Sequence, residues 1–174
     1  MKLSIRLAKK SDLVAYTILH QKTFQDAYTN KKIGLTKKHF SKKVFSSLRI
    51  QDYLRSNLTL TKKQKTWVVF LKSEMIGSIT RTDKGKEYEL RGFYVLPKYQ
   101  GRGIGKQLWK HALNFAKRKD ITLDIYAHQL KTINMYKKWG FKIDRKKKAF
   151  YRHWAEWPKR LKAKCIYMRL SSKS

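Results

Sequence analysis

The sequence predicts one domain of the α/β (α+β) class, in which helices cover the faces of a sheet. Two observations support this. Runs that alternate apolar and polar residues, typical of strands, are interspersed with stretches whose apolar residues recur at helical spacing. In chain order these give one strand, two helices, three strands, one helix, one strand, one helix and two strands. Because 174 residues with 41% hydrophobic content suffice for one core, residues 1–174 are expected to form a single domain.

The first part of the chain predicts a strand followed by two helices. Residues 3–7 alternate as a short strand, and Ser11 and Asp12 then offer an N-cap and an acid for the first turn of a helix. A weaker helical pattern follows over residues 36–57. The apolar face of the first helix holds, at helical spacing, Leu13, Tyr16, His20, Phe24 and Ala27. A histidine in such a face is usually a core residue with satisfied polar atoms, and we expect this of His20.

The later elements follow from alternation and from turn residues. The clearest helix covers residues 103–118, and a shorter one over 131–139 is expected to stop at Gly140, since glycine readily adopts a left-handed cap conformation. Pro97 ends the strand before the longer helix. The remaining expected strands, of which the first two predict a hairpin, are residues 66–71, 75–80, 88–96, 121–127, 141–143 and 164–170.

The charge balance is unusual. The chain has 43 Lys and Arg residues against 11 Asp and Glu residues, a formal net charge of +32. Such a field attracts polyanions, although it says nothing about the fold. Two interpretations stay open: association with RNA or the ribosome, or a lysine-rich composition whose side chains are simply solvated.

Composition argues against several other classes. No apolar run approaches the ~20 residues that cross a bilayer, and residues 1–6 lack the apolar stretch of a secretory signal. We therefore expect a cytoplasmic protein without a membrane partner. The single cysteine, Cys165, allows no disulfide framework and no cysteine cluster for zinc, so no metal site is expected. A homodimer is left open.

A glycine-rich turn precedes the clearest helix. Its residues are Gln100, Gly101, Arg102, Gly103, Ile104, Gly105 and Lys106. Glycines let a backbone approach a ligand closely, and the unpaired N–H groups at a helix N-terminus point at an anion with the helix dipole behind them. Successive N–H groups of this kind form an anion-binding nest. The spacing fits neither a Walker A loop nor a Rossmann fingerprint, so the turn predicts phosphate binding of another kind.

Two motifs carry a family resemblance. Residues 95–105 resemble motif A of the GNAT superfamily of N-acetyltransferases, written there as Gln/Arg-x-x-Gly-x-Gly/Ala. Residues 135–141, Met-Tyr-Lys-Lys-Trp-Gly-Phe, resemble that family's aromatic-Tyr-x-x-x-Gly-Phe segment. The resemblance covers roughly residues 89–141. It implies a mixed, mostly antiparallel sheet of six to seven strands with about four helices on its faces, and acetyl-coenzyme A (acetyl-CoA) as co-substrate.

The resemblance also implies roles for individual residues. The N–H groups from Gln100 to Lys106 would bind the pyrophosphate of acetyl-CoA, and Tyr136 would be the general acid that protonates the coenzyme A sulfur. The fourth and fifth strands of the family splay apart, so main-chain groups at Tyr94 and Val95 would pair with pantetheine, and Val95 N–H would stabilise the oxyanion. Where many members have Asn and Ala on the pantetheine side, this chain has Gln129 and Thr132.

A general base is less clearly marked. Glu89 lies eleven positions before Gln100, which matches the strand glutamate of the histone-acetylating branch of the family. A glutamate acts as a base near neutral pH when apolar neighbours raise its pKa, and we expect Phe93 on the same strand face to help. The alternative is a surface salt bridge from Glu89 to a lysine. Asp124 is a less favoured base.

The segment between the last two strands mixes cations with aromatic rings. Residues 145–164 hold nine Lys or Arg residues and four aromatics, Phe150, Tyr151, Trp154 and Trp157. Nucleic-acid surfaces combine cations with rings in this way. Because tryptophan is usually well buried, we favour a long loop whose aromatic residues pack inward and whose lysines face solvent.

The resemblance implies transfer to an amine, and three hypotheses for the function stay open. One is a small amine, a polyamine or a peptide, although a protein of charge +32 would repel a polycation unless its site were locally acidic. Another is an acceptor on an RNA-linked or ribosomal assembly, such as aminoacyl-tRNA or a ribosomal protein. The last is a GNAT fold that binds nucleic acid without catalysis, against which the intact turn and Tyr136 argue.

Overall fold

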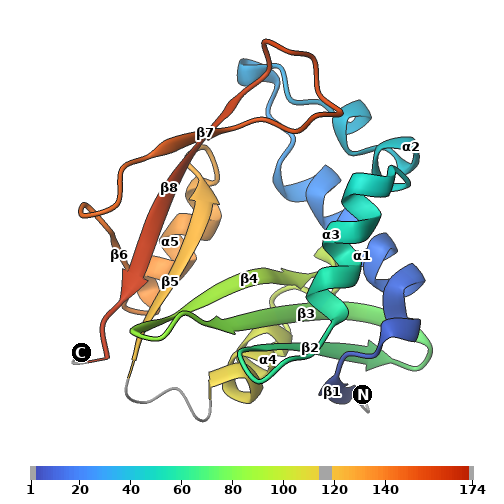
Figure 1. The fold of residues 1–174 in the computed structure, drawn as a ribbon, viewed down its shortest axis with the longest axis vertical. Coiled ribbons are helices and arrows are strands. Elements are labelled where there is room, and N and C mark those ends of the chain that lie inside the picture. The colour runs from blue at the N-terminus through green and yellow to red at the C-terminus, as the bar shows by residue number, and fades with distance from the viewer. Residues whose placement is uncertain (1–2, 114–118, 173–174) are drawn as a thin grey trace.

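The computed structural model describes residues 3–113 and 119–172, which contain one mixed sheet of eight strands (Figure 1). Seven strands follow the order β1-β2-β3-β4-β5-β8-β6, and β7 pairs with β8 off this path. Among the described strands, only the β4–β5 pair is parallel. The strand bounds are β1 Leu3–Leu7, β2 Gln64–Leu71, β3 Glu74–Asp83, β4 Glu87–Val95, β5 Asp120–Tyr126, β6 Lys142–Ile143, β7 Phe150–Arg152 and β8 Ala163–Leu170. The predicted mixed, mostly antiparallel sheet is confirmed.

Helices cover both faces of the sheet. Within the described residues the α-helices are α1 Leu13–Ala27, α2 Lys42–Phe45, α3 Leu48–Leu58, α4 Ile104–Leu113 and α5 Leu130–Lys138. Tyr94 of β4 packs its ring against His20 and Phe24 of α1, whereas Phe93 packs against Trp109 of α4. Since neighbouring strand residues point to opposite faces, α1 and α4 lie on opposite sides of β4. No helix in the described part of the chain is long and apolar enough to cross a membrane.

The sheet opens between β4 and β5. These strands pair only at Glu87, Tyr88 and Glu89 of β4 with residues 120–122 of β5, whereas β5 pairs with β8 over six positions. Figure 1 shows the consequence: β2–β4 run across the view and β5 and β8 run steeply away from them. Main-chain groups in the second half of β4 therefore lie without a strand partner on the β5 side.

A bulge in β4 sets which side chains face the opening. Arg91 pairs with Thr80 and Tyr94 pairs with Ser78, so β4 has one residue more than β3 over this stretch. Gly92 has φ of 56°, and a Cβ there would lie 3.1 Å from the hydroxyl of Tyr16. The extra residue shifts the alternation, so Tyr94 shares a face with Arg91 and Glu89. The prediction that Phe93 lies on the face of Glu89 is wrong for this reason.

Most of the predicted element bounds hold, and the predicted cap of the first helix needs correction. Residues 3–7 form β1 as predicted, and α5 ends before Gly140, which has φ of 90°. Helix α1 begins at Leu13, and the side chain of Asp12 does not cap it. That side chain accepts two hydrogen bonds from Arg6 and one from the backbone N–H of Lys9, which caps the 3₁₀ turn Lys10–Asp12. Of the helix predicted over 103–118, residues 104–113 are confirmed and residues 114–118 lie outside the described part.

The single helix expected over residues 36–57 is wrong. This stretch holds a 3₁₀ turn at Lys37–Phe40 and then α2 and α3. Ser41 and Ser47 each accept a hydrogen bond from a backbone N–H three residues later. Such N-caps start new helices, which divides the segment.

The loop after β6 packs its aromatic residues inward, as favoured from the sequence. Trp157 is 4% exposed, and its ring and that of Trp154 stack 5.3 Å apart against Phe40. Tyr151 is the exception, at 66% exposed. Within this loop Phe150–Arg152 form β7, a strand that the sequence did not predict, and Figure 1 shows the chain running on from β7 toward α2.

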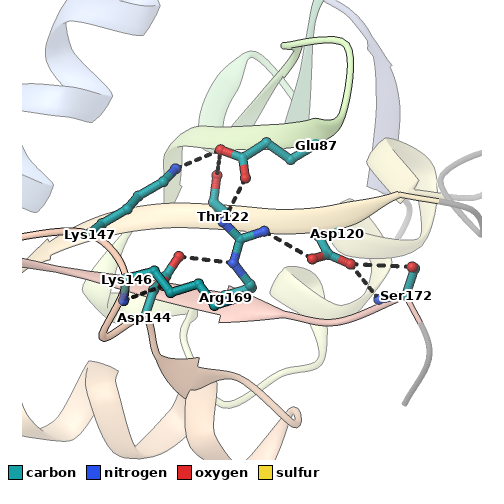
Figure 2. A network of polar contacts seen from close by, with 8 residues as sticks. All are labelled: Glu87, Asp120, Thr122, Asp144, Lys146, Lys147, Arg169 and Ser172. Atoms are coloured by element: carbon teal, nitrogen blue, oxygen red, sulfur yellow. Dashed lines mark hydrogen bonds and ion pairs between the residues drawn. The ribbon is translucent and has the colours of Figure 1, made fainter.

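A charge network fastens the closed end of the opening (Figure 2). The guanidinium of Arg169 on β8 donates to Glu87 on β4 at 2.7 Å, to Asp120 on β5 at 2.9 Å and to Asp144 at 2.9 Å. Lys147 donates to the other oxygen of Glu87 at 2.6 Å. One side chain thus joins three strands just where β4 and β5 are still paired.

We expect Arg169→Met to lower the free energy of unfolding by about 2 kcal/mol at pH 7, because it leaves three carboxylates close together without their shared cation. Burial alone would raise the pKa of Glu87 and of Asp144. Hydrogen bonds from Lys147 and Arg169 lower the pKa of Glu87, and hydrogen bonds from Arg169 and the backbone N–H of Lys146 lower that of Asp144. A lowered pKa stabilises the fold above the ordinary carboxyl value and loses that contribution as pH falls through the lowered value. The deficit of the variant should therefore shrink toward pH 3 in urea titrations.

The control is Arg55→Met, whose ion pair with Asp52 on α3 is exposed, at 54% and 70% of the two side chains. It should change stability by less than about 0.5 kcal/mol. Equal effects of the two substitutions at pH 7 would contradict the clamping role of Arg169.

Candidate functional site

A groove of about 530 Å³ lies between β4, β5 and the starts of α4 and α5. It collects most of the cofactor residues predicted from the sequence. Arg102 is not among the lining residues; its guanidinium lies 5.8 Å from the ring centre of Tyr99. The predicted residues that line the groove are Tyr94, Val95, Gln100, Gly101, Gly103, Ile104, Gly105, Lys106, Gln129, Thr132 and Tyr136.

The glycine turn presents a row of free backbone donors to this groove. Gly101 and Gly103 have φ of 75° and 77°, and a Cβ on either would meet no atom within 4 Å. Glycine is needed there for backbone conformation rather than for space. The first N–H of α4 that donates to a backbone carbonyl is that of Gln107, to Gly103 at 3.1 Å. Among the described residues, the N–H groups of 101–106 donate to no carbonyl, which is the donor set of an anion nest.

The backbone N–H of Gln100, which was expected to bind phosphate, is already hydrogen-bonded within the turn. Its N–H donates to Pro97 at 3.1 Å, so the nest begins one residue later than predicted. Its side-chain amide donates to the carbonyl of Val95 at 2.9 Å. Gln100 therefore ties the turn to the end of β4.

Val95 directs its N–H into the opening. The next residue, Leu96, donates its N–H to Ile76 on β3 at 2.9 Å. Because successive strand residues direct their N–H and C=O groups to opposite sides, those of Val95 point away from β3. The bond from Gln100 to the Val95 carbonyl agrees with this direction. A donor thus faces the groove at the position where the sequence predicts one.

Tyr136 on α5 lines the same groove. It is 6% exposed and packs against Phe141 at 5.2 Å and Phe93 at 6.5 Å between ring centres. No described residue hydrogen-bonds to its hydroxyl. Burial raises the pKa of Tyr136 well above its ordinary value of 10.0. The phenol is therefore protonated at neutral pH and can donate a proton.

Gln129 and Thr132 lie at the start of α5. Gln129 is the N-cap residue, yet its side chain caps no backbone N–H. Both residues line the groove, so their side chains lie beside any ligand arm that passes from the glycine turn toward Tyr136.

A second cavity, of about 390 Å³, lies on the other side of β4, among α1, α3 and residues 152–154 of the loop after β6. It meets the groove at residues that line both, among them Tyr28, Arg91, Gly92, Tyr94 and Asp124. The hydroxyls of Tyr28 and Tyr94 lie 2.8 Å apart at this junction. The side chain of Tyr94 therefore belongs to the junction, whereas only its neighbours Phe93 and Val95 face α4.

Glu89 lines the second cavity but not the groove. Its carboxylate lies 3.1 Å from the ammonium of Lys84 and 3.9 Å from the guanidinium of Arg91. The salt bridge considered as the alternative for Glu89 is thus present. Asp124 lines both cavities and accepts a hydrogen bond from Arg152 at 2.7 Å. Both candidate bases are paired with cations.

His20 is buried as predicted, at 1% exposed, and lines the second cavity. The expectation that its polar atoms are satisfied is wrong, because neither ring nitrogen has a hydrogen-bond partner among the described residues. Burial lowers the pKa of His20 to about 3, so the ring is neutral. Its place in the first helix was visible in the sequence, but the cavity beside it was not.

Fold and site together define an acyltransferase of the acetyl-CoA type, and the chain belongs to the acetyltransferase (GNAT) family, whose model matches residues 21–141. Two solved structures share the fold over 98% of this chain. One is the PaiA N-acetyltransferase from Thermoplasma acidophilum in complex with coenzyme A, at TM-score 0.66 and 20% identity over 99% of that chain. The other is the ribosomal-protein-S18-alanine N-acetyltransferase from Escherichia coli, at 0.67 and 16% over 94%.

A curated relative matches over a shorter stretch. It is the N-alpha-acetyltransferase RimI of Mycobacterium tuberculosis, 33% identical over 66 residues. These residues are 38% of this chain and 42% of the relative, so the match spans less than half of either protein.

Proposed function

We propose that this chain transfers the acetyl group of acetyl-CoA to a primary amine by direct attack in a ternary complex. The observation that supports this best is the continuity of the groove. It runs from the free N–H groups of residues 101–106, past the outward-facing N–H of Val95, to the hydroxyl of Tyr136. A diphosphate, an extended arm and a reactive thioester need donors in this order.

The residues present fit acetyl-CoA, which supplies the activated acetyl group as a thioester. The nest at residues 101–106 would hold the pyrophosphate, with Lys106 and Arg102 adding charge. Tyr94, Gln129 and Thr132 would border the pantetheine arm, with Val95 pairing its main-chain groups with the arm.

Two residues have chemical roles in this proposal. Val95 N–H hydrogen-bonds the carbonyl oxygen as negative charge develops on it. Tyr136 holds a proton at its hydroxyl and donates it to the sulfur that leaves.

The amine would enter through the second cavity and meet the acetyl group at the junction. An amine attacks only when neutral, so a carboxylate must take up one proton, directly or through water. We propose Glu89 for this step. Asp124 is the alternative, because it lies at the junction itself but is held by Arg152 at 2.7 Å.

The test measures acetyl-CoA binding by calorimetry and release of the free thiol with a panel of amines. We expect saturable binding and amine-dependent thiol release. Glu89→Gln should lower kcat at least about tenfold without changing acetyl-CoA affinity. The matched control is Glu87→Gln on the same strand, in the Arg169 network. No heat with acetyl-CoA or coenzyme A would refute the proposal, and an unchanged kcat in Glu89→Gln would move the base to Asp124.

A ribosomal or RNA-linked acceptor is the second candidate. It is favoured by the net charge of +32 and by the RimI match, together with the fold shared with the S18-alanine acetyltransferase. Binding that weakens steeply with added salt would support it. A cytoplasmic location, a homodimer and a single domain over residues 1–174 stay predictions.

A further inference from the structure

The charges of the second cavity limit which amines it can accept. Its lining holds the carboxylates of Glu89 and Asp124 and the guanidinium groups of Arg49, Arg91 and Arg152. Each carboxylate already has a cation from the same chain: Lys84 lies beside Glu89 and Arg152 beside Asp124. Each acid therefore already has a positive charge beside it, although Oε2 of Glu89 has no hydrogen-bond partner among the described residues and can still accept a proton.

The cations of the cavity outnumber the acids, and Nε of Arg91 lies 3.9 Å from Glu89. The guanidinium of Arg91 donates to Gln64 at 2.8 Å and to Thr82 at 3.2 Å, but its Nε, buried from solvent, has no hydrogen-bond partner among the described residues. Arg49 uses its Nε and one amino group on Glu156, which leaves its other amino group available. The lining thus holds three guanidinium groups against two carboxylates, and each carboxylate already has a cation beside it.

The middle of the cavity is aromatic. Phe24, Phe45 and Trp154 line it together with Tyr53, which is 45% exposed. The ring of Trp154 lies 5.4 Å from Phe24 and 6.1 Å from Phe45. These rings line the same cavity as Arg49 and as the residues of the junction, such as Tyr28 and Tyr94. An apolar spacer between amine and anion suits such walls.

From these observations we propose that the acceptor is a primary amine whose molecule also carries a carboxylate or a phosphate, recognised by Arg49 and Arg91. This acceptor proposal rests on the proposed acetyltransferase function and adds the chemical class of its acceptor. It also disfavours polyamines, since a second ammonium group would lie in a cavity with more guanidinium than carboxylate groups. The overall charge of +32 acts in the same direction.

The experiment compares four amines of matched reach: tyramine, 4-(2-aminoethyl)benzoate, O-phosphorylated tyramine and spermidine. We measure kcat/KM by thiol release, and binding of each amine to the protein by calorimetry with and without coenzyme A. A hydrogen-bonded charge pair is worth enough to favour the carboxylate or the phosphate probe over tyramine by at least about tenfold. Spermidine should be the poorest of the four. The carboxylate and phosphate arms show which anion is preferred.

Two variants locate the anion. Arg49→Gln should reduce the preference for the anionic probe about fivefold or more, since a charged partner becomes a neutral one. The matched control is Arg55→Gln on the same helix. The two arginines are equally exposed, at 55% and 54%, and both are ion-paired, but Arg55 does not line the cavity. Its preference should not change. An unchanged preference in Arg49→Gln would overturn the assignment to Arg49.

The outcomes separate the two proposals. If acetyl-CoA binds and tyramine or spermidine is bound or acetylated as well as the anionic probes, the acceptor class is wrong while the acetyltransferase function stands. Failure of both anionic probes to bind overturns the acceptor class as well. If acetyl-CoA itself does not bind, the proposed function fails, whatever the amines do.

Discussion

Gly103→Val should weaken acetyl-CoA binding by about 100-fold or more. The residue has φ of 77°, which a β-branched side chain adopts only at a cost of roughly 1–2 kcal/mol. The chain escapes this cost by turning the peptide groups around Gly103, and the N–H groups of the nest then no longer converge. Losing one hydrogen bond to a charged phosphate oxygen adds about 1.5–3 kcal/mol. Together these terms reach the stated factor, which calorimetry on the purified variant would measure.

A second glycine separates loss of the nest from strain alone. Gly85, in the turn between β3 and β4, has φ of 85° and, like Gly103, no atom within 4 Å of a Cβ. Gly85→Val therefore carries a similar strain in an equally open place but lies outside the groove. It should bind acetyl-CoA like the unchanged protein. Micromolar affinity in Gly103→Val would show that the nest does not hold the diphosphate.

The parts of the fold that could be predicted are those with short-range causes. The turn at residues 100–106 is marked by its glycines and by the helix they precede, and both are where the sequence places them. The end of α5 at Gly140 is equally local. Patterns that one segment carries by itself can be seen in one sequence.

The bulge in β4 shows what remains hidden. Its cause is tertiary, because Gly92 permits close approach by Tyr16 of α1, and nothing near residue 92 in the sequence announces that contact. The one extra residue reverses the face of the sheet to which each later side chain of β4 points. Phe93 was expected beside Glu89, and it lies instead on the side of Tyr136, 6.5 Å from that ring.

The second cavity was missed for a related reason. Its lining comes from α1, α2, α3, β4, β5 and residues 152–154, which are up to 134 positions apart in the chain. Tyr28, Arg49 and Arg152 have no motif of their own. Glu89 could be found by its spacing from Gln100, but its salt bridge with Lys84 depends on the β3–β4 turn.

The opening between β4 and β5 combines two opposite demands. At its closed end, Arg169 holds β4, β5 and β8 together through charges. At its open end, β4 separates from β5 and leaves the N–H of Val95 free to donate. A short parallel pairing of three residues is enough because the ionic network supports it. The residues that stabilise the β4–β5 pair thus lie at one end of these strands, and the Val95 N–H proposed for the reaction lies at the other.

Tyr136→Phe should lower kcat by about 100-fold, the lower part of the range for a positioned general acid, while leaving acetyl-CoA affinity nearly unchanged. The phenylalanine ring keeps the packing against Phe141 and Phe93, so only the proton donor is removed. Calorimetry and thiol-release kinetics on the same preparation measure the two quantities separately.

The control for this variant is Tyr16→Phe. Tyr16 is fully buried and its hydroxyl has no hydrogen-bond partner among the described residues, but it lines neither cavity. Its loss should leave kcat unchanged. Because burial raises the pKa of Tyr136, its hydroxyl stays protonated at pH values above the ordinary pKa of tyrosine. The kcat of the unchanged protein should therefore show no fall between pH 7 and 9. Equal turnover in Tyr136→Phe and the unchanged protein would remove this hydroxyl from the reaction and leave protonation of the leaving sulfur to solvent.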